Sequence, residues 1–399
     1  MIASQALDIA ERRSDAVSAN GFALQASIVV GREGLEALAD RWLTLEAQCP
    51  DATVFQSLGW ARAIFDFEAR RGNARFEPVV IALKHGRRLV GILPLERIRT
   101  FSRTALVPLG NAFGQYADAL VAPSMDARMA LDQMLRAAID SGACDFVSLL
   151  KVREGSALER GLPQTKVMTG EEQGAPYVAL DAFPDFASYF QTIRTKTRKN
   201  LRNARNRLER EGIVAHDVVT DPQAQLQLVE RTLAGRAERL KDQGLTSRAF
   251  RDSNFSDFCR SLVNRPDTSL AAFSLLHDGK PIAEQWGFVH GRKYYAFIAS
   301  RDFSNSEESP GKLQLAEIVQ ACSQMGIAGC DLGVPVMPYK LTFATRTLAV
   351  RDFALPVTPK GFVIIHLWDV RLRPALKSMA MAMPAAWRAR AMKVFGRRP

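Results

Sequence analysis

The segment from Ser309 to Leu313 has the composition of a phosphate-binding helix start. It reads Ser-Pro-Gly-Lys-Leu and follows a β-rich run that ends near Ser300. Serine favours the N-cap position and proline favours the first helical turn. Gly311 would let a ligand approach the backbone, while the helix N-terminus and Lys312 would attract anions. An ordinary capped helix has the same residues, but strand–loop–helix is the arrangement of nucleotide-phosphate sites.

Polar residues that follow this helix could supply acid–base chemistry. Asp331 stands where a short strand is predicted to end, and Tyr339 and Lys340 come shortly after it. A carboxylate and a phenol beside a phosphate-binding helix could act as base and acid; the alternative is a plain strand end and turn. Glu284 is a charged residue within an apolar strand, so it either faces solvent or points into a cleft.

Two parts of the chain share one plan. Residues 76–99 and 269–291 each predict a β-hairpin that is followed by a strand, a loop, an amphipathic helix and a short strand. This order predicts an α/β protein with mixed sheets covered by helices, built from a duplicated unit. The first half lacks the phosphate loop. There, Tyr116 and Asp118 are candidates for a wall that faces an acceptor, or they belong to a surface turn.

A basic segment lies between the two halves. Residues 191–211 contain eight lysines and arginines against two acidic residues. Their pattern predicts a helix over 193–211, either a binding surface for an anion or a solvated connection. Its narrow apolar stripe recurs at helical spacing and consists of Ile193, Thr197, Leu201, Ala204 and Leu208.

Composition limits the class of protein. The chain has 399 residues and a net charge of +11, yet residues 1–190 carry slightly more acidic than basic groups. Basic charge that is concentrated in one segment favours local contacts with an anion. A protein that binds nucleic acid over a broad surface usually distributes its basic residues over a whole face. Five scattered cysteines indicate a reduced, intracellular protein, and the histidines lack metal-ligand spacing. We expect a cytoplasmic protein without a metal, because no signal peptide or spanning segment is evident.

The last residues, 371–399, carry eight basic and no acidic groups. Pro384 divides this tail, and its second part places Trp387 and Phe395 among arginines, which suits a weak contact with an anionic membrane at its inner face. In the alternative interpretation the end of the tail is solvated and its first part covers the C-terminal domain through Leu372, Leu376, Met379 and Met383.

The order of several short motifs resembles the CelD-like acetyltransferases, a cellulose-biosynthesis group within the GNAT superfamily. The motifs are LVGILPL, RKNLRNARNRLEREG, DGKPIA, SPGKLQL and CDLG followed by YK, and the resemblance spans roughly residues 30–355. It implies two tandem GNAT-like domains joined by the basic helix. The domains expected from it are an N-terminal domain over 1–190, the helix over 191–212, a donor-binding domain over 213–355 and a tail over 356–399.

The resemblance also implies a reaction. An acyl group would move from acyl-coenzyme A to an amine or hydroxyl acceptor in polysaccharide or cell-envelope synthesis. The strand at Phe297, Ile298 and Ala299 would pair with the pantetheine arm, and residues 309–313 would hold the pyrophosphate. Only Gly311 remains of the two or three loop glycines that GNAT enzymes have. The implied catalytic groups are Asp331 or Glu284 as base and Tyr339 as acid.

Two other functions fit the same pattern. The more distantly similar FemABX peptidyltransferases have the same tandem fold and take aminoacyl groups from transfer RNA; a non-catalytic accessory protein of polysaccharide synthesis could also keep the fold. Arg198, Lys199 and Arg202, with Lys340, could hold coenzyme A or an anionic sugar, or the helix could hold tRNA phosphates. The basic helix has no interleaved aromatic residues for base stacking, which disfavours general nucleic-acid binding.

Overall fold

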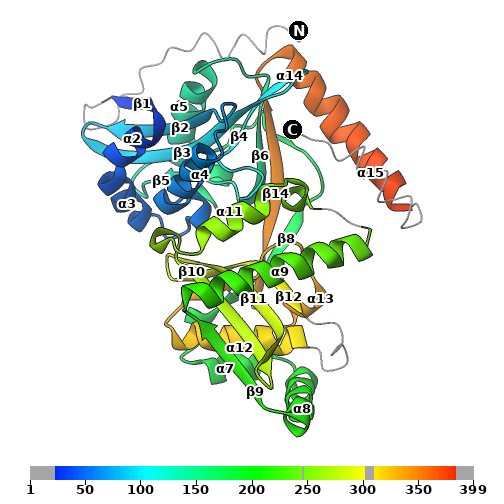
Figure 1. Cartoon of the computed structure of the whole chain (residues 1–399). Helices are drawn as coiled ribbons and strands as arrows, with labels where there is room; N and C mark the ends of the chain where they lie inside the picture. Colours follow the sequence, from blue (N-terminus) through cyan, green and yellow to red (C-terminus); the bar gives the residue numbers. More distant parts are fainter. Residues whose placement is uncertain (1–22, 245–246, 302–309, 383–399) are drawn as a thin grey trace. The chain divides into compact units, whose positions relative to one another are not determined.

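The computed structural model describes residues 23–244, 247–301 and 310–382 (Figure 1). The chain forms two compact units. Unit 1 contains the residues up to Glu172 and those from Val350 onward, and unit 2 contains Gln173–Ala349. This division differs from the predicted ranges at both ends. Residues 173–190 belong to unit 2 because β8 (Gln173–Ala179) pairs with a strand of that unit.

Unit 1 contains a mixed sheet in the order β1-β2-β3-β4-β6-β14. The β2–β3 ladder is antiparallel, whereas β4 and β6 run parallel. Two short strands, β5 on β3 and β7 on β14, extend it. Its strands are β1 (Leu24–Val29), β2 (Pro78–His85), β3 (Arg88–Arg99), β4 (Thr104–Pro108), β5 (Leu120–Val121), β6 (Phe146–Arg153), β7 (Val167–Met168) and β14 (Arg346–Pro356).

The helices of unit 1 begin at residues suited to that position. Ser57, Asp126 and Ser156 each accept a backbone N–H of the first turn that follows. These helices are α2 (Gly31–Ala37), α3 (Ala39–Gln48), α4 (Leu58–Arg70), α5 (Ala127–Asp140), α6 (Ala157–Gly161), α14 (Pro359–Val363), the π-helix η4 (Ile364–Leu372) and α15 (Arg373–Ala382).

Unit 2 repeats this architecture. Its strands follow the order β9-β10-β11-β12-β13-β8, with β13 parallel to β12 and the β9 to β12 ladders antiparallel. The predicted turn between β10 and β11 is present, and Asp278 and Gly279 both have positive φ, as a type I′ turn requires. The strands are β8, β9 (Val214–Val219), β10 (Leu270–His277), β11 (Lys280–His290), β12 (Lys293–Arg301) and β13 (Gly329–Asp331).

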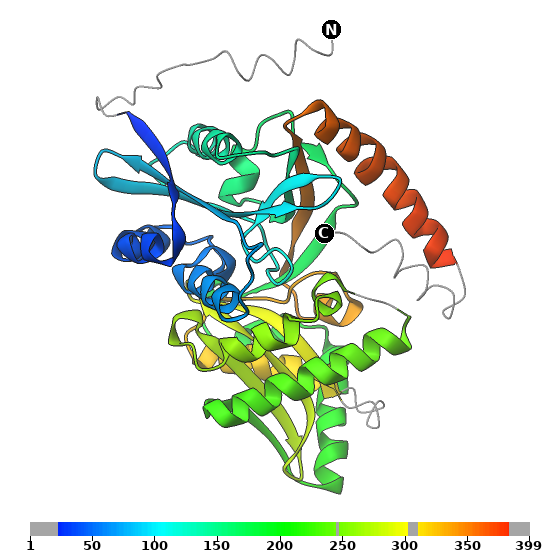
Figure 2. The same ribbon diagram turned by 45° about the horizontal axis from the view of Figure 1, so that its top comes forward.

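Helices cover both faces of the unit 2 strands. In Figures 1 and 2, α9 crosses one face of β11 and β12 while α12 lies on the opposite face. The helices are α7 (Phe186–Thr192), α8 (Thr195–Glu211), α9 (Pro222–Asp242), α10 (Arg248–Arg251), α11 (Phe255–Leu262), α12 (Pro310–Gln324) and α13 (Pro338–Leu341). The two units thus share the order of three antiparallel strands, a helix and a parallel strand, which confirms the predicted α/β class and its internal duplication.

The basic helix is part of unit 2. α8 begins at Thr195 and ends at Glu211, and its apolar residues Leu201, Ala204 and Leu208 are buried. Leu201 lies in the main core cluster of the unit, so α8 packs on α12 and is not a free connection. The stripe was correctly predicted for Leu201, Ala204 and Leu208, whereas Ile193 lies before the helix, at the end of α7.

The end of the described chain forms a helical rod that runs from α14 through η4 to α15 (Figure 2). The rod belongs to unit 1, and two of the residues expected to cover the C-terminal domain, Leu372 and Met379, are exposed at 44% and 62%. The interfacial segment expected around Trp387 lies outside the described residues, as does Met383. Within the described residues, no helix is both long and apolar enough to cross a bilayer.

Candidate functional site

The ladder between β12 and β13 ends early. β13 pairs with Lys293, Tyr294 and Tyr295 only, and its last residue Asp331 stands opposite Tyr295. β12 continues to Arg301 along β11. Ile298 therefore lies on a part of β12 that the parallel ladder no longer covers, as does Ala299, and this edge could pair with an extended ligand.

A β-bulge occurs at the same point of β12. Gly287 stands opposite Ala296 and Trp286 stands opposite Ile298, so Phe297 is an additional residue. Its ring packs on Trp286 at 5.0 Å, which gives the side chain a structural role. Gly287 is required here, because a Cβ atom would lie 2.0 Å from the Tyr295 carbonyl oxygen.

The helix α9 approaches β12 closely beside this edge. A Cβ atom on Gly235 would lie 2.2 Å from Ser300 Oγ and 3.2 Å from Ser300 Cβ, so a larger residue would force the serine side chain to shift. Trp286 Nε1 donates a hydrogen bond to Thr232 Oγ1 at 3.0 Å, which fixes the preceding turn of α9. Arg236 follows Gly235 on α9, and its charge and that of Arg301 on β12 both act on the Tyr339 phenol.

The charges of three guanidinium groups act on the Tyr339 phenol. Burial raises the pKa of Tyr339, and the nearby charges of Arg239, Arg236 and Arg301 oppose that rise. Burial also lowers the pKa of Arg236, and repulsion from Arg239 adds to the effect. The half-buried ring of Tyr339 packs against the core of unit 2. Several cationic groups near one phenol produce a positive potential that would attract an anionic ligand.

The start of α12 contributes to the same region. Pro310 opens the helix, and a Cβ atom on Gly311 would lie 3.5 Å from Arg301 Cδ, which places the two residues side by side. Lys312 is exposed, whereas Leu313 is buried in the core and is not available to a ligand. The predicted cap Ser309 lies outside the described residues.

Gln314 is the second polar feature of this helix. It is 3% exposed, and neither its amide oxygen nor its amide nitrogen has a hydrogen-bond partner among the described residues. Because a buried amide without a partner is costly, its presence in the second turn of α12 suggests a ligand that supplies one.

Asp331 and Lys340 shape the loop between β13 and α13. Asp331 is 1% exposed, and its Oδ1 atom accepts the backbone N–H of Gly333 at 2.8 Å. Lys340 Nζ donates to the carbonyl oxygens of Gly333 and Pro335 at 2.8 and 3.2 Å. Burial lowers the pKa of Lys340 to about 8, although the Asp331 carboxylate opposes this shift. The pair thus positions α13, which carries Tyr339.

Glu284 neither faces solvent nor stands beside Asp331. It is 5% exposed and accepts from Arg231 of α9, with the shortest nitrogen–oxygen distance 2.6 Å. Glu284 stands opposite Ser300 on β12, whereas Asp331 stands opposite Tyr295 of the same strand. These two positions are five residues apart, which corresponds to roughly 17 Å along a strand. The structure therefore separates the two predicted bases, and the ion pair with Arg231 holds α9 in place.

The candidate cations of α8 lie on the outer side of that helix. Lys199 and Arg202 are exposed, and the half-buried Arg198 donates to Thr195 Oγ1 at 3.3 Å. The α8 residue that contacts α12 is Arg205, whose Nη1 pairs with Glu317 at 2.5 Å. No described interaction joins the three predicted residues to Tyr339.

Tyr116 and Asp118 are buried within unit 1. The Tyr116 ring lies 6.1 Å from the Phe55 ring and 5.3 Å from the Arg153 guanidinium carbon. Asp118 Oδ1 accepts the backbone N–H groups of Ala119 and Leu158 at 2.8 and 2.9 Å. The prediction of a surface turn is thus wrong for both residues, and Asp118 joins α6 to the sheet region.

Asp118→Asn is expected to reduce the pH dependence of stability. Burial raises the pKa of Asp118 from 3.8 to about 6. Between these values the folded state binds more protons than the unfolded state, so stability falls as pH rises. The variant keeps the Oδ1 acceptor but cannot titrate. Between about pH 4 and 5.5 the unmodified protein should therefore lose roughly 1–2 kcal/mol more folding stability than the variant does. Urea unfolding at both pH values gives the free energy of unfolding of each protein. An equal change of this free energy with pH in the variant and the unmodified protein would contradict the prediction.

Comparisons with known proteins agree with this architecture. Residues 195–341 match the family described as acetyltransferase (GNAT) domain. The crystal structure of FemX is similar with a TM-score of 0.56 and 11% identity, over 83% of this chain and 98% of FemX. No curated protein matches the chain. The FemX likeness supports the fold over most of the chain, and the GNAT match lies within unit 2, whose order of elements unit 1 repeats.

Two further solved structures have lower scores. A tandem GNAT protein from the clavulanic acid biosynthesis pathway has a TM-score of 0.47 and 10% identity, over 84% of this chain and 99% of that one. The C-terminal domain of a putative lysylphosphatidylglycerol synthetase from Agrobacterium fabrum has a TM-score of 0.47 and 15% identity. This similarity covers 84% of this chain and 95% of that domain.

The sequence analysis missed the arginines of α9 and β12. Arg236 and Arg239 are three residues apart on a helix that also carries Gly235. Glycine inside a long helical pattern indicates close packing, and this was the available signal. The approach of α9 to Arg301 depends on tertiary packing and has no local signature.

Proposed function

We propose that unit 2 transfers an acyl group from acyl-coenzyme A to an amine or hydroxyl acceptor. The observation that carries the proposal is that Arg301 lies beside Gly311 at the start of α12, while the charges of Arg236, Arg239 and Arg301 all act on the Tyr339 phenol. A pyrophosphate is the anion that a helix start next to guanidinium groups binds well. The match of residues 195–341 to the GNAT domain supports the same donor.

The site residues have distinct roles in this proposal. The guanidiniums, Gly311 and Lys312 hold the pyrophosphate, and the edge of β12 at Ile298 and Ala299 pairs with the pantetheine arm. The fixed backbone donors of β12 stabilise the oxyanion, which is commonly the largest contribution. The side-chain amide of Gln314 would form hydrogen bonds with the bound ligand.

The reaction is a direct displacement at the thioester carbonyl. The acceptor nitrogen or oxygen forms a bond to the carbonyl carbon, and the carbon–sulfur bond breaks. Asp331 takes the proton of the acceptor, and Tyr339 gives its proton to the leaving thiolate. Glu284 is held by Arg231, so we assign the base to Asp331. Lys340 orients the loop that carries both groups.

The resemblance to CelD-like proteins extends the proposal to an acceptor of polysaccharide or cell-envelope synthesis. It also agrees with a cytoplasmic site and a contact of residues 383–399 with the inner face of a membrane. A tRNA-dependent aminoacyltransferase is the second candidate, because the FemX fold matches over most of the chain and Lys199 and Arg202 are exposed.

Calorimetry with acetyl-coenzyme A and filter binding with bulk tRNA distinguish these candidates. We expect micromolar binding of acetyl-coenzyme A, about −8 kcal/mol, and no salt-dependent retention of tRNA. The Arg198→Gln/Lys199→Gln/Arg202→Gln variant should bind acetyl-coenzyme A unchanged if these residues serve an acceptor. Tight tRNA binding with a steep salt slope, lost in this variant, would favour the aminoacyltransferase. Binding of neither ligand would indicate an accessory protein.

A further inference from the structure

Unit 1 exposes large apolar side chains on two neighbouring segments. Phe101, in the turn between β3 and β4, has a relative exposure of 110%. The helical rod exposes a second set of apolar residues, with values from 37% to 55%. That set consists of Phe362, Val363, Leu367, Val370 and Leu372. Several exposed large apolar side chains within one short segment mark an interaction site more often than singly scattered ones do.

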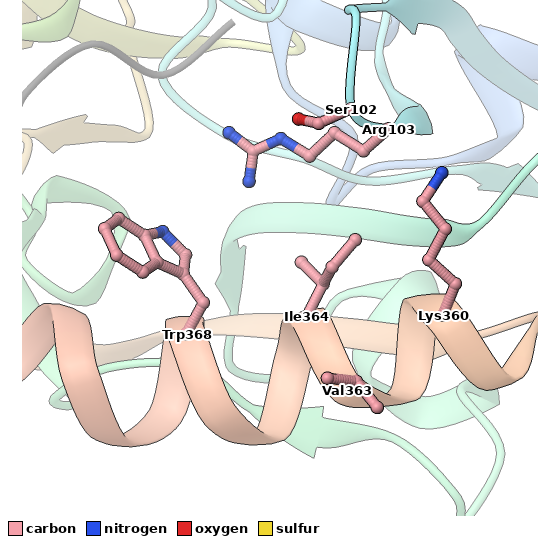
Figure 3. A pocket seen from close by; sticks show the side chains of 6 residues that line it. All are labelled: Ser102, Arg103, Lys360, Val363, Ile364 and Trp368. Carbon is pink, nitrogen blue, oxygen red and sulfur yellow. The ribbon is translucent and has the colours of Figure 1, made fainter.

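A pocket joins the two segments. It has a volume of about 540 Å³ and is lined by Ser102 and Arg103 from the turn and by four residues of the rod. Figure 3 shows the Arg103 side chain extending over the helix from which Trp368 and Ile364 rise toward it. Lys360 stands at the other end of the pocket. An apolar floor thus lies below two cationic groups.

The charges around this surface are mainly basic. Arg371 is exposed on the rod next to Val370 and Leu372. The acidic groups nearby are already engaged or buried: Asp145 pairs with Lys360 at 3.0 Å, and Asp369 is 4% exposed. From Arg371 to the end of the chain there are eight basic and no acidic residues.

We propose that this apolar–basic face, formed by Phe101, Arg103 and the outer side of residues 362–372, binds the surface of an anionic phospholipid bilayer. Apolar side chains would enter the boundary between headgroups and acyl chains, as interfacial helices do. The pocket would take one lipid phosphate beside Arg103, with Trp368 at headgroup level. A protein partner would account for the apolar residues but not for the uniformly basic continuation.

This inference does not depend on the proposed acyl transfer, because the face belongs to unit 1 and uses none of the site residues of unit 2. It also differs from the contact expected around Trp387. The residues that form this face all precede residue 383. They would therefore remain in a chain shortened to residue 382.

Flotation of the full chain with lipid vesicles tests the proposal. We expect the protein to float with vesicles of phosphatidylcholine and phosphatidylglycerol at low salt, but not with phosphatidylcholine alone. Phe101→Ser/Phe362→Ser/Leu367→Ser should stay at the bottom of the gradient. The matched control Val30→Ser/Ile213→Ser replaces residues exposed at 78% and 76% elsewhere and should float like the unmodified protein.

A second pair of variants tests the charge. Arg103→Gln/Arg371→Gln should lower partition at least tenfold, since each basic residue near the surface contributes about fivefold. Arg75→Gln/Arg87→Gln, two exposed arginines outside the face, should have little effect. Unchanged melting temperatures show that the variants fold. Equal flotation of the face variants and the control variants would overturn the proposal. It would also be overturned if the unmodified protein never floats and instead forms a dimer, and if the triple serine variant abolishes that dimer.

Discussion

Tyr339→Phe is expected to lower kcat about a hundredfold while KM for acyl-coenzyme A changes less than about twofold. The substitution removes the proton that the proposal gives to the leaving thiolate and keeps the ring that packs on the core of unit 2. The guanidiniums of Arg236, Arg239 and Arg301 remain, so donor binding should survive. Thiol release from acetyl-coenzyme A, measured with a panel of amines and sugars, gives both constants.

Tyr189→Phe is the matched control for this prediction. Its hydroxyl donates to the Phe343 carbonyl oxygen at 2.6 Å within the same core, so it has a structural partner. The control should lose about 1 kcal/mol of stability and keep its kcat. If Tyr339→Phe retains full activity with an accepted substrate, Tyr339 is not the acid and only its packing matters.

Much of the fold could be predicted because its signals are local. The helical stripe of α8 follows from residues three and four apart, and the β10–β11 turn follows from Asp278 and Gly279. The duplication follows from comparing 76–99 with 269–291. These features depend on short-range geometry, which the order of residue types determines.

The division of the chain and the guanidinium cluster could not be predicted in this way. β14 returns to unit 1 because it pairs with β6, a partner about 200 residues earlier in the sequence. Glu284 finds Arg231, and Gly235 meets Ser300, only when α9 packs on the sheet. Asp118 is buried because Leu158, forty residues later in the chain, packs over it within unit 1. Each of these facts requires the tertiary pairing of distant elements, which no local pattern specifies.

Gly311→Val is expected to weaken the binding of acetyl-coenzyme A ten- to a hundredfold, about 1.4–2.7 kcal/mol. The nearest atom to a new Cβ is Arg301 Cδ at 3.5 Å, an ordinary contact, so the protein alone accommodates the first added carbon. A pyrophosphate held at the backbone of this helix start would meet the branched side chain instead. Gly311→Ala should show a smaller loss, and calorimetry gives both constants.

The dependence on salt separates this steric effect from a loss of charge. Lys312→Ala should weaken binding less than Gly311→Val, and its loss should shrink as salt is raised, because exposed charges are screened. The loss caused by valine should stay constant over the same range. Gly114→Val, where a Cβ atom would have its nearest neighbours at 3.8 Å in unit 1, serves as the matched control and should bind normally. Undiminished affinity of Gly311→Val would exclude the start of α12 as the pyrophosphate site, and the arginines of α9 would then have to serve another anion.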